Sequence, residues 1–474
     1  QLGIDRKLKE LGLSRHHLAA SLGVIAARMI VPGSERSTHY WLQNVSAFDE
    51  LMGVDFSNLS LDRVYKVSDW LLKHKDVLEE HLRRSEGQLF ALEEKIILYD
   101  LTNTFFEGTG TYNSKARYGR SKEKRSDCPL VTLGLVLDMH GFAKKSQIFE
   151  GNASEPKTLE TMIGGLSGGF SRIRPTIVLD AGIASEVNIQ WLKDRHYPYI
   201  VVSRKKRKEI PPDVAMIAVK EDDTTNTVLV QAGLVKSKET DEVELYCHST
   251  DKEKKEESIT TTFQQRFEAE LTKAGNALHL KNGTKRYEKV VERIGRLKER
   301  FKVVSHHYTI SVEKDTETGK AKTITWSRRK TEKTPGIYCL RTDRKDLNEQ
   351  QIWDMYTMLT DIEDAFRCMK SELGLRPIYH QKGSRCDGHI FITLLAYHVL
   401  HTIRFQLRHK GVRLSWTTIR RHLSTQVRIT TTMKRQDGKV IRIRKSSKAE
   451  SSHHVIYDAL NVAYQPGRTV KTIL

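Results

Sequence analysis

Lys95-Ile-Ile-Leu-Tyr-Asp-Leu101 is an apolar run that carries one carboxylate, and it is the first strand candidate along the chain. The second candidate, Leu130-Val-Thr-Leu-Gly-Leu-Val-Leu-Asp138, is followed by a turn at Met139-His-Gly141 and by a third candidate from Phe142 to Phe149. This order predicts a strand and then a hairpin.

Beyond the hairpin, helices and strands are expected to alternate. A helix is predicted from Glu155 to Leu166, a strand over Thr176-Ile-Val-Leu-Asp180, a helix after the potential cap Ser185, and a strand over Tyr199-Ile-Val-Val-Ser203. A parallel strand reached through a helix fits a right-handed crossover, which gives a mixed sheet with helices on its faces. We therefore expect an α/β fold with the strand order of an RNase H-like sheet.

The regular pattern breaks at Arg204-Lys-Lys-Arg-Lys208 and resumes near Gly336, which predicts an inserted unit. One long charged stretch, from Asp251 to Lys302, has a helical pattern. The strand-like runs around it are Val214 to Val219, Thr227 to Ala232, Val243 to Cys247 and Val303 to Val312.

The chain is thus expected to contain several domains. We expect a helical, DNA-binding N-terminal domain over residues 1–92, a sheet domain in two parts over 93–204 and 336–410, a mixed β/α insertion domain over 205–335, and a basic region over 411–474. For the N-terminal helices the alternative is a packed bundle without DNA contact. The tail from Arg413 to Lys448 is rich in Arg and Lys, and we expect it to be a loosely packed arm that contacts DNA.

The net charge points to the class of partner. Lys and Arg outnumber Asp and Glu by 79 to 59 in 474 residues, a formal net charge of +20. Cations that neutralise phosphates release condensed counterions, so this excess predicts a polyanion, with double-stranded DNA as the first candidate. A membrane surface is disfavoured because the longest apolar run, Ile390 to Ile403, contains two histidines and is shorter than the ~20 residues that a bilayer needs. We expect a buried helix there and no membrane partner.

The ends and the cysteines bear on the cellular compartment. The amino-terminal sequence has no continuous apolar stretch and no small-residue cleavage site, which predicts a cytoplasmic protein. The five cysteines are scattered and lack a CxxC spacing, which disfavours a disulfide framework and a zinc site.

Two carboxylates border apolar strands. Asp100 lies within one strand candidate and Asp180 at the end of another, where each costs desolvation energy unless a cation or hydrogen bonds compensate it. One such aspartate would be interpreted as a turn or cap residue, but two on adjacent strands of one sheet favour a shared site.

A third carboxylate comes from the helix expected between Gln350 and Leu373. Its apolar residues alternate three and four apart and form one buried stripe. Tyr356, Glu363 and Lys370 are seven apart and line one edge of that stripe, and Arg367, one turn beyond Glu363, shares that edge. The alternative for this row alone is a solvated helix face with ordinary charge pairs.

Together, Asp100, Asp180 and Glu363 suit phosphodiester chemistry. Three carboxylates can hold two hard divalent cations, Mg²⁺ with Mn²⁺ as a substitute, and the ions activate a water or a 3′-hydroxyl and stabilise the leaving oxygen. Lys370 and Arg367 would then bind DNA phosphates.

The same residues resemble the DDE transposases of bacterial insertion sequences that carry a Tyr-x2-Arg-x3-Glu-x6-Lys signature. Tyr356, Glu363 and Lys370 match its spacing in full, whereas Leu359 stands where the family has Arg, and Arg367 is the candidate substitute. Similar segments elsewhere extend the resemblance over roughly residues 95–204 and 336–405. They are Tyr99-Asp-Leu-Thr102, Gly119-Arg-Ser-Lys-Glu-Lys-Arg-Ser-Asp127, Gly151-Asn-Ala-Ser-Glu155, Val178-Leu-Asp-Ala-Gly182, Ile362 to Ser371 and Arg376-Pro-Ile-Tyr-His380.

The resemblance implies a magnesium-dependent enzyme with an RNase H-like core that cleaves DNA at the ends of an element and joins the freed 3′-hydroxyl to target DNA. Asp100, Asp180 and Glu363 would be the metal ligands, and Tyr356 and Lys370 would hold phosphates. It also implies a homodimer on paired ends, at work on the bacterial nucleoid.

Two alternatives remain open. An RNase H-like nuclease without strand transfer would share the metal chemistry, although the large insertion and the helical N-terminal region favour transposition. A DNA-binding protein descended from a transposase would normally have a degraded triad, and here the triad is intact.

Overall fold

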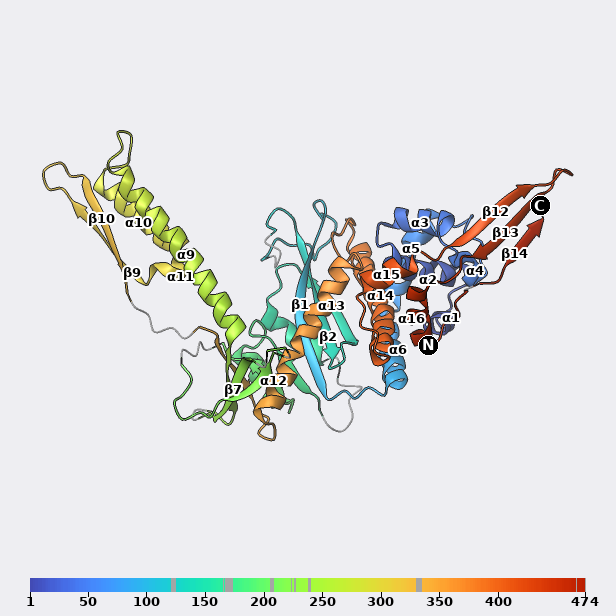
Figure 1. Ribbon diagram of the computed structural model, residues 1–474, viewed down its shortest axis with the longest axis horizontal. Coiled ribbons are helices and arrows are strands. Elements are labelled where there is room, and N and C mark those ends of the chain that lie inside the picture. The colour runs from blue at the N-terminus through green and yellow to red at the C-terminus, as the bar shows by residue number, and fades with distance from the viewer. Residues whose placement is uncertain are drawn as a thin grey trace. The chain divides into compact units, whose positions relative to one another are not determined.

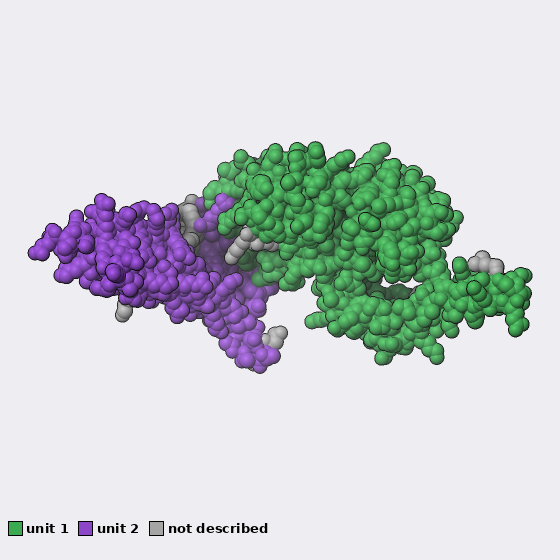
Figure 2. All heavy atoms as spheres, turned by 90° about the horizontal axis from the view of Figure 1, so that it is seen from above, with its two compact units in different colours: residues 1–199, 355–474 green, residues 200–354 purple. Residues whose placement is uncertain are grey.

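The computed structural model describes all residues except 121–124, 165, 167–173, 205–208, 223, 226, 238–239, 330–334, 466 and 474. Most of the basic run from Arg204 to Lys208 and part of the helix expected after Glu155 thus lie outside the described residues. The chain divides into two compact units (Figure 2). The first comprises residues 1–199 and 355–474, and the second comprises residues 200–354.

The N-terminal residues are helical. Three of the helices begin after Ser14, Ser34 and Ser60, whose hydroxyls each accept the backbone N–H three residues further on, a cap worth about 1 kcal/mol. The helices are α1 (Ile4–Glu10), α2 (Arg15–Ile30), α3 (Glu35–Asn44), α4 (Phe48–Met52), α5 (Leu61–Lys73) and α6 (Lys75–Phe90).

The sheet of the first unit has the strand order β3-β2-β1-β4. Strand β1 pairs antiparallel with β2 and parallel with β4. All nine residues of β2 are buried and β1 is buried on both faces, as expected for strands covered by helices on either side. This confirms the predicted α/β fold with an RNase H-like mixed sheet. The strands are β1 (Ile96–Phe105), β2 (Leu130–Asp138), β3 (Ala143–Glu150) and β4 (Thr176–Leu179).

Helices flank this sheet. After β3 come the 3₁₀ helix η1 (Glu155–Thr158) and α7 (Leu159–Gly164), and after β4 comes α8 (Glu186–Asp194). The long helix predicted from Gln350 to Leu373 is divided into α12 (Glu349–Thr357) and α13 (Leu359–Ser371). Met358 between them keeps helical backbone angles, φ −59° and ψ −17°, so the seven-residue alignment of side chains continues across the break.

Helix α14 (Gly383–His409) is the buried helix expected from the apolar run. Its length and composition would allow it to cross a membrane, but 72% of its most apolar window is buried inside the protein. It packs against α2 and α5, and so joins the N-terminal helices to the rest of the first unit (Figure 1).

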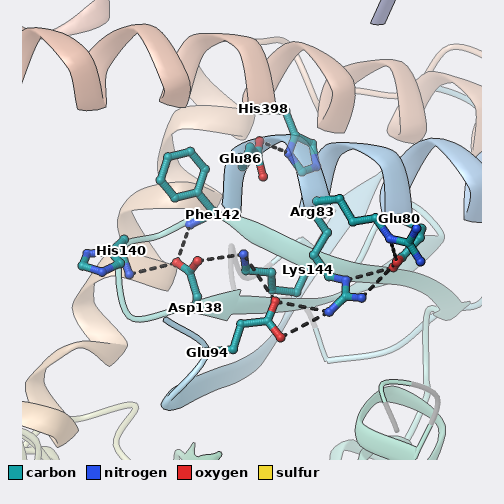
Figure 3. Close-up of polar contacts among 10 residues, drawn as sticks. Glu80, Arg83, Glu86, Glu94, Asp138, His140, Phe142, Lys144 and His398 are labelled. Atoms are coloured by element: carbon teal, nitrogen blue, oxygen red, sulfur yellow. Dashed lines mark hydrogen bonds and ion pairs between the residues drawn. The ribbon is translucent and has the colours of Figure 1, made fainter. Parts of the chain in front are cut away.

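A buried ion pair fixes the β2–β3 turn. The Asp138 carboxylate is fully buried and accepts the backbone N–H groups of His140 and Phe142 at 2.9 and 3.0 Å. The ammonium of Lys144, 1% exposed, lies 2.9 Å from Asp138 and 3.7 Å from Glu94 (Figure 3). Since both charges of the pair are removed from water, each depends on the other.

A second buried pair joins α6 to α14. The ring Nδ1 of His398 lies 2.7 Å from Oε1 of Glu86, and both side chains are at most 1% exposed (Figure 3). The N-terminal helices are therefore attached to the core helix by polar contacts as well as by apolar packing.

The second unit contains five strands that pair in the order β5-β11-β8-β7-β6, and a helical hairpin. Helices α9 (Thr250–Ala277) and α10 (Tyr287–Arg300) pack with β9 and β10 around one apolar cluster that includes Phe267 and Leu297. The other elements are β5 (Tyr199–Val202), β6 (Ile217–Glu221), β7 (Val228–Lys236), β8 (Val243–Ser249), α11 (Lys302–Ser305), β9 (Tyr308–Lys314), β10 (Ala321–Arg328) and β11 (Ile337–Thr342).

Two predictions for the insertion are wrong. The charged stretch expected as one helix from Asp251 to Lys302 forms two helices with a turn between them. The strand expected from Val303 to Val312 begins only at Tyr308, because Val304 is fully buried in the apolar cluster as part of the short helix α11.

The C-terminal tail has regular secondary structure, and residues 428–434 are almost all exposed, as expected for a loosely packed arm, whereas the helix before them is packed. Helix α15 (Trp416–Leu423) is anchored by Trp416, whose indole N–H donates to the carbonyl of Met29 at 2.9 Å. A three-stranded sheet follows, and its base is attached by ion pairs from Arg428 and Arg444 to Glu50 of α4. The elements are β12 (Arg428–Lys434), β13 (Val440–Ser446), α16 (Ser451–Leu460) and β14 (Val470–Ile473).

Candidate active site

The register of β1 and β4 brings Asp100 and Asp180 to the same end of the first unit's sheet. Tyr99 is in register with Leu179; Asp100 is the next residue of β1, and Asp180 directly follows the last residue of β4. Adjacent strands are about 4.8 Å apart, and side chains in register point to the same face. The sequence prediction that these two carboxylates share one end of a sheet agrees with this register.

Helix α13 lies on the face of β1 to which Asp100 points. Side chains alternate along a strand, so Asp100 shares its face with Thr104. The Thr104 hydroxyl donates to the carbonyl of Leu375, 3.2 Å away, in the segment that follows α13, and α13 itself contacts β1 (Figure 1). The helix that carries Glu363 therefore covers the aspartate face of the sheet.

Glu363 lies on an exposed edge of α13. Its neighbours Ile362 and Phe366 are buried, whereas Glu363 is exposed. Two turns away in either direction, Tyr356 at the end of α12 and Lys370 near the end of α13 are half-buried. The row of a phenol, a carboxylate and an ammonium predicted from the spacing is therefore aligned along one helical edge.

Arg367 forms an ion pair within its own helix. Its guanidinium pairs with Asp364, and both side chains are exposed. Leu359, which occupies the family's arginine position, is half-buried as the first residue of α13. A DNA phosphate that bound Arg367 would have to compete with Asp364.

The turn after β4 holds the Asp180 side chain in place. One of its carboxylate oxygens accepts the backbone N–H of Gly182, while the side chain stays exposed. Ser185 then begins α8, and its hydroxyl accepts the backbone N–H of Asn188 at 3.2 Å. The predicted serine cap is thus present, and the acidic side chain remains open to a ligand.

Glu155 has no role predicted from the sequence, although its carboxylate lies close to the Asp180 turn. Burial raises the pKa of Tyr99, and the nearby carboxylates of Asp100 and Glu155 raise it further. The only sequence signal was an acidic residue directly after the Gly151-Asn-Ala-Ser turn, which does not by itself indicate proximity to β4.

The donor set fits hard divalent cations. Carboxylate oxygens are the ligands that Mg²⁺ and Mn²⁺ prefer, and Asp100 and Asp180 supply them from adjacent strands. Asp180 and Glu363 are exposed and Asp100 is half-buried, so a ligand as large as DNA can approach from the solvent side.

Among the described residues, the one group of side chains spaced closely enough to share a metal ion does not include the three acidic residues, and it is better explained as structure. Ligand atoms of Glu35, His380 and His389 lie within 4.8 Å of one another. However, the two ring nitrogens of His389 lie 3.1 Å from the Gly374 carbonyl and 3.3 Å from the guanidinium of Arg28. Burial, and then the charge of Arg28, lowers the pKa of His389 to about 3. A second cation is therefore disfavoured there.

Comparisons with known proteins show the family of the chain. The family model described as Transposase DDE domain matches residues 92–399, a span that contains Asp100, Asp180 and Glu363. No curated protein matches the chain. Among solved structures the chain is similar to the cryo-EM structure of a piggyBac transposase synaptic complex with hairpin DNA, at 11% identity and a TM-score of 0.39, over 87% of this chain and 70% of that chain. A likeness at that TM-score says nothing further about function.

Proposed function

Because the chain belongs to the Transposase DDE domain family, we propose that it is the transposase of a bacterial insertion sequence. In this proposal it cleaves DNA at the ends of the element and joins each freed 3′-hydroxyl to target DNA. The reaction depends on Mg²⁺, with Mn²⁺ as a substitute.

The register of β1 and β4 is the observation that best supports this proposal. Tyr99 is opposite Leu179, so Asp100 and Asp180 follow at the same level, with α13 on their face of the sheet. Two aspartates on adjacent strands and a glutamate on the covering helix suit a pair of divalent ions that act on one phosphodiester.

Each residue has a distinct proposed role. Asp100, Asp180 and Glu363 hold the ions, which supply activation of the attacking oxygen and neutralise charge on the phosphate when bound. Lys370 and Tyr356, on the same helical edge as Glu363, bind phosphates on either side of the scissile one. Arg367 takes the place of the family's arginine by exchanging Asp364 for a phosphate.

The remaining parts of the chain are proposed to bind DNA. The net charge of +20 supports a polyanionic partner. The helical residues 1–92 would recognise the element's end, and the exposed strand β12 and the exposed cations of β13, Arg442 and Lys445, would contact the flanking backbone. In this proposal residues 205–335 form an insertion domain. The protein acts as a homodimer on paired ends, on nucleoid DNA in the cytoplasm.

Glu363→Gln tests the proposed role of the acidic residues. Wild type and variant are incubated with Mg²⁺ and with DNA segments that flank the gene, and cleaved and joined products are separated by electrophoresis. We expect the variant to lose more than about 100-fold of both activities, since the amide removes a charged ligand. Glu160→Gln, an exposed carboxylate paired with Arg195 at 3.4 Å, is the matched control and should keep both.

The products also discriminate the activities. Cleavage without joining by the wild type would indicate a nuclease, and full activity of Glu363→Gln would remove that residue from the proposed site.

A further inference from the structure

The carboxylate of Glu155 lies against the turn that holds Asp180. A Cβ atom built on Gly182 would lie 2.2 Å from Oε2 of Glu155 and 3.5 Å from Oδ1 of Asp180. One oxygen of the Glu155 carboxylate and one oxygen of the Asp180 carboxylate therefore lie near Gly182. Any side chain at position 182 would displace Glu155, so the glycine is what lets the two acidic groups approach each other.

One buried side chain connects the two turns. The amide of Asn188, which is 7% exposed, donates to the carbonyl of Pro156 at 2.8 Å and to the carbonyl of Ile183 at 2.7 Å. Pro156 follows Glu155, and Ile183 follows Gly182. The two hydrogen bonds therefore keep the Glu155 turn and the Asp180 turn at a fixed spacing.

A second connection joins the Glu155 turn to β1. The phenol of Tyr99 donates to the Thr158 hydroxyl at 2.6 Å, and that hydroxyl donates to the Glu155 carbonyl at 2.6 Å. Tyr99 directly precedes Asp100. The backbone of Glu155 is thus connected to β1, which carries Asp100, and, through Asn188, to the turn that follows Asp180.

The Glu155 carboxylate itself is not explained by a structural partner. Among the residues that the structure describes, no hydrogen bond or ion pair to this carboxylate is found, whereas Glu160, on the adjoining helix, pairs with Arg195. Two carboxylates held close together repel each other unless a cation lies between them, and a divalent ion satisfies both through oxygen.

We propose that Glu155 is a fourth carboxylate ligand of the divalent-cation site, on the side of Asp180. This inference rests on the proposed function, which assigns the site to Asp100, Asp180 and Glu363. Glu155 would then hold a divalent ion together with Asp180, and Asp100 and Glu363 would supply the other carboxylates.

Mn²⁺ binding to the full-length protein tests this inference directly. Free Mn²⁺ is measured by electron paramagnetic resonance during a titration with MnCl₂, for wild type, Glu155→Gln, Gly182→Ala and Asp100→Asn. We expect Glu155→Gln to weaken binding at least ~10-fold. Gly182→Ala keeps every carboxylate but forces Glu155 aside, so it should weaken binding in the same direction. Glu160→Gln should bind as the wild type does.

The outcomes separate this inference from the proposed function. Wild-type affinity in both Glu155→Gln and Gly182→Ala, with binding lost in Asp100→Asn, would overturn the role of Glu155 and leave the proposed function standing. Wild-type affinity in Asp100→Asn, or no Mn²⁺ binding by the wild type, would overturn the proposed site and the Glu155 assignment with it. Circular dichroism of each variant checks that it is folded.

Discussion

Replacement of Lys144 by methionine should destabilise the first unit strongly. The substitution keeps a long apolar side chain, so little packing is lost, but it leaves the fully buried Asp138 carboxylate without its cation 2.9 Å away. Removing one partner of a buried ion pair costs about 3–5 kcal/mol. Because two backbone N–H groups still donate to Asp138, we expect a value near the lower end of that range.

The assay must report on each unit separately. Hydrogen exchange followed by mass spectrometry at increasing urea concentration gives the unfolding free energy of β2 in the first unit and of β8 in the second unit. The β2 peptide should lose protection at a lower urea concentration in Lys144→Met, while the β8 peptide should be unchanged.

Two further variants identify the cause. Lys95→Met removes an ammonium from an exposed pair with Glu93 and should have little effect. The double variant Asp138→Asn, Lys144→Met removes both charges and should recover part of the loss. A cost below about 1 kcal/mol in Lys144→Met would refute the reasoning, because it would mean that the buried carboxylate does not need its cation.

Three other predictions follow from the described contacts. Burial lowers the pKa of His401 to about 4, below its value in the unfolded chain, so the free energy of unfolding should fall by about 3 kcal/mol as the pH falls from 6.5 to 4. Urea unfolding at each pH measures this, and an equally large fall in the free energy of unfolding of His401→Gln would contradict it. Lys370→Ala should weaken DNA binding and reduce the slope of log affinity against log salt by about 1, and an unchanged slope in fluorescence anisotropy would exclude a phosphate contact. Gly151→Ala should lower the unfolding free energy by roughly 1–3 kcal/mol, since its Cβ would lie 2.1 Å from the carbonyl oxygen of Leu130; a melting temperature equal to that of the wild type would argue against it.

The strands of the first unit were predictable because their sequence signals are local. β2 has the predicted bounds, because its continuous apolar run ends at the turn that contains Gly141. The helical edge of Glu363 and Lys370 was predictable from spacing alone, because the break at Met358 keeps helical angles.

Other features depend on contacts between distant segments. The Val303-Val304 run has β-branched residues, but Val304 packs into the cluster of α9 and α10, which favours a helical turn there. Glu155 lies beside Gly182 because the amide of Asn188 donates hydrogen bonds to both turns. The spacing of these turns in the sequence does not indicate that they are close. The ion pair of Lys144 with Asp138 could not be predicted from the sequence, because the sequence does not distinguish a buried lysine from an exposed one.

The order of the two units along the chain has a consequence for the cell. Residues 200–354 separate Asp180 from Glu363, and proteins are synthesised from the N-terminus at about 5–20 residues per second. A nascent or prematurely terminated polypeptide therefore exposes its two aspartates well before the ribosome releases the glutamate helix and α14, on which α2 and α5 pack. With the roles proposed for Asp100, Asp180 and Glu363, incomplete translation products are expected to be unable to break a DNA strand, because the third ligand is added only after most of the message has been read.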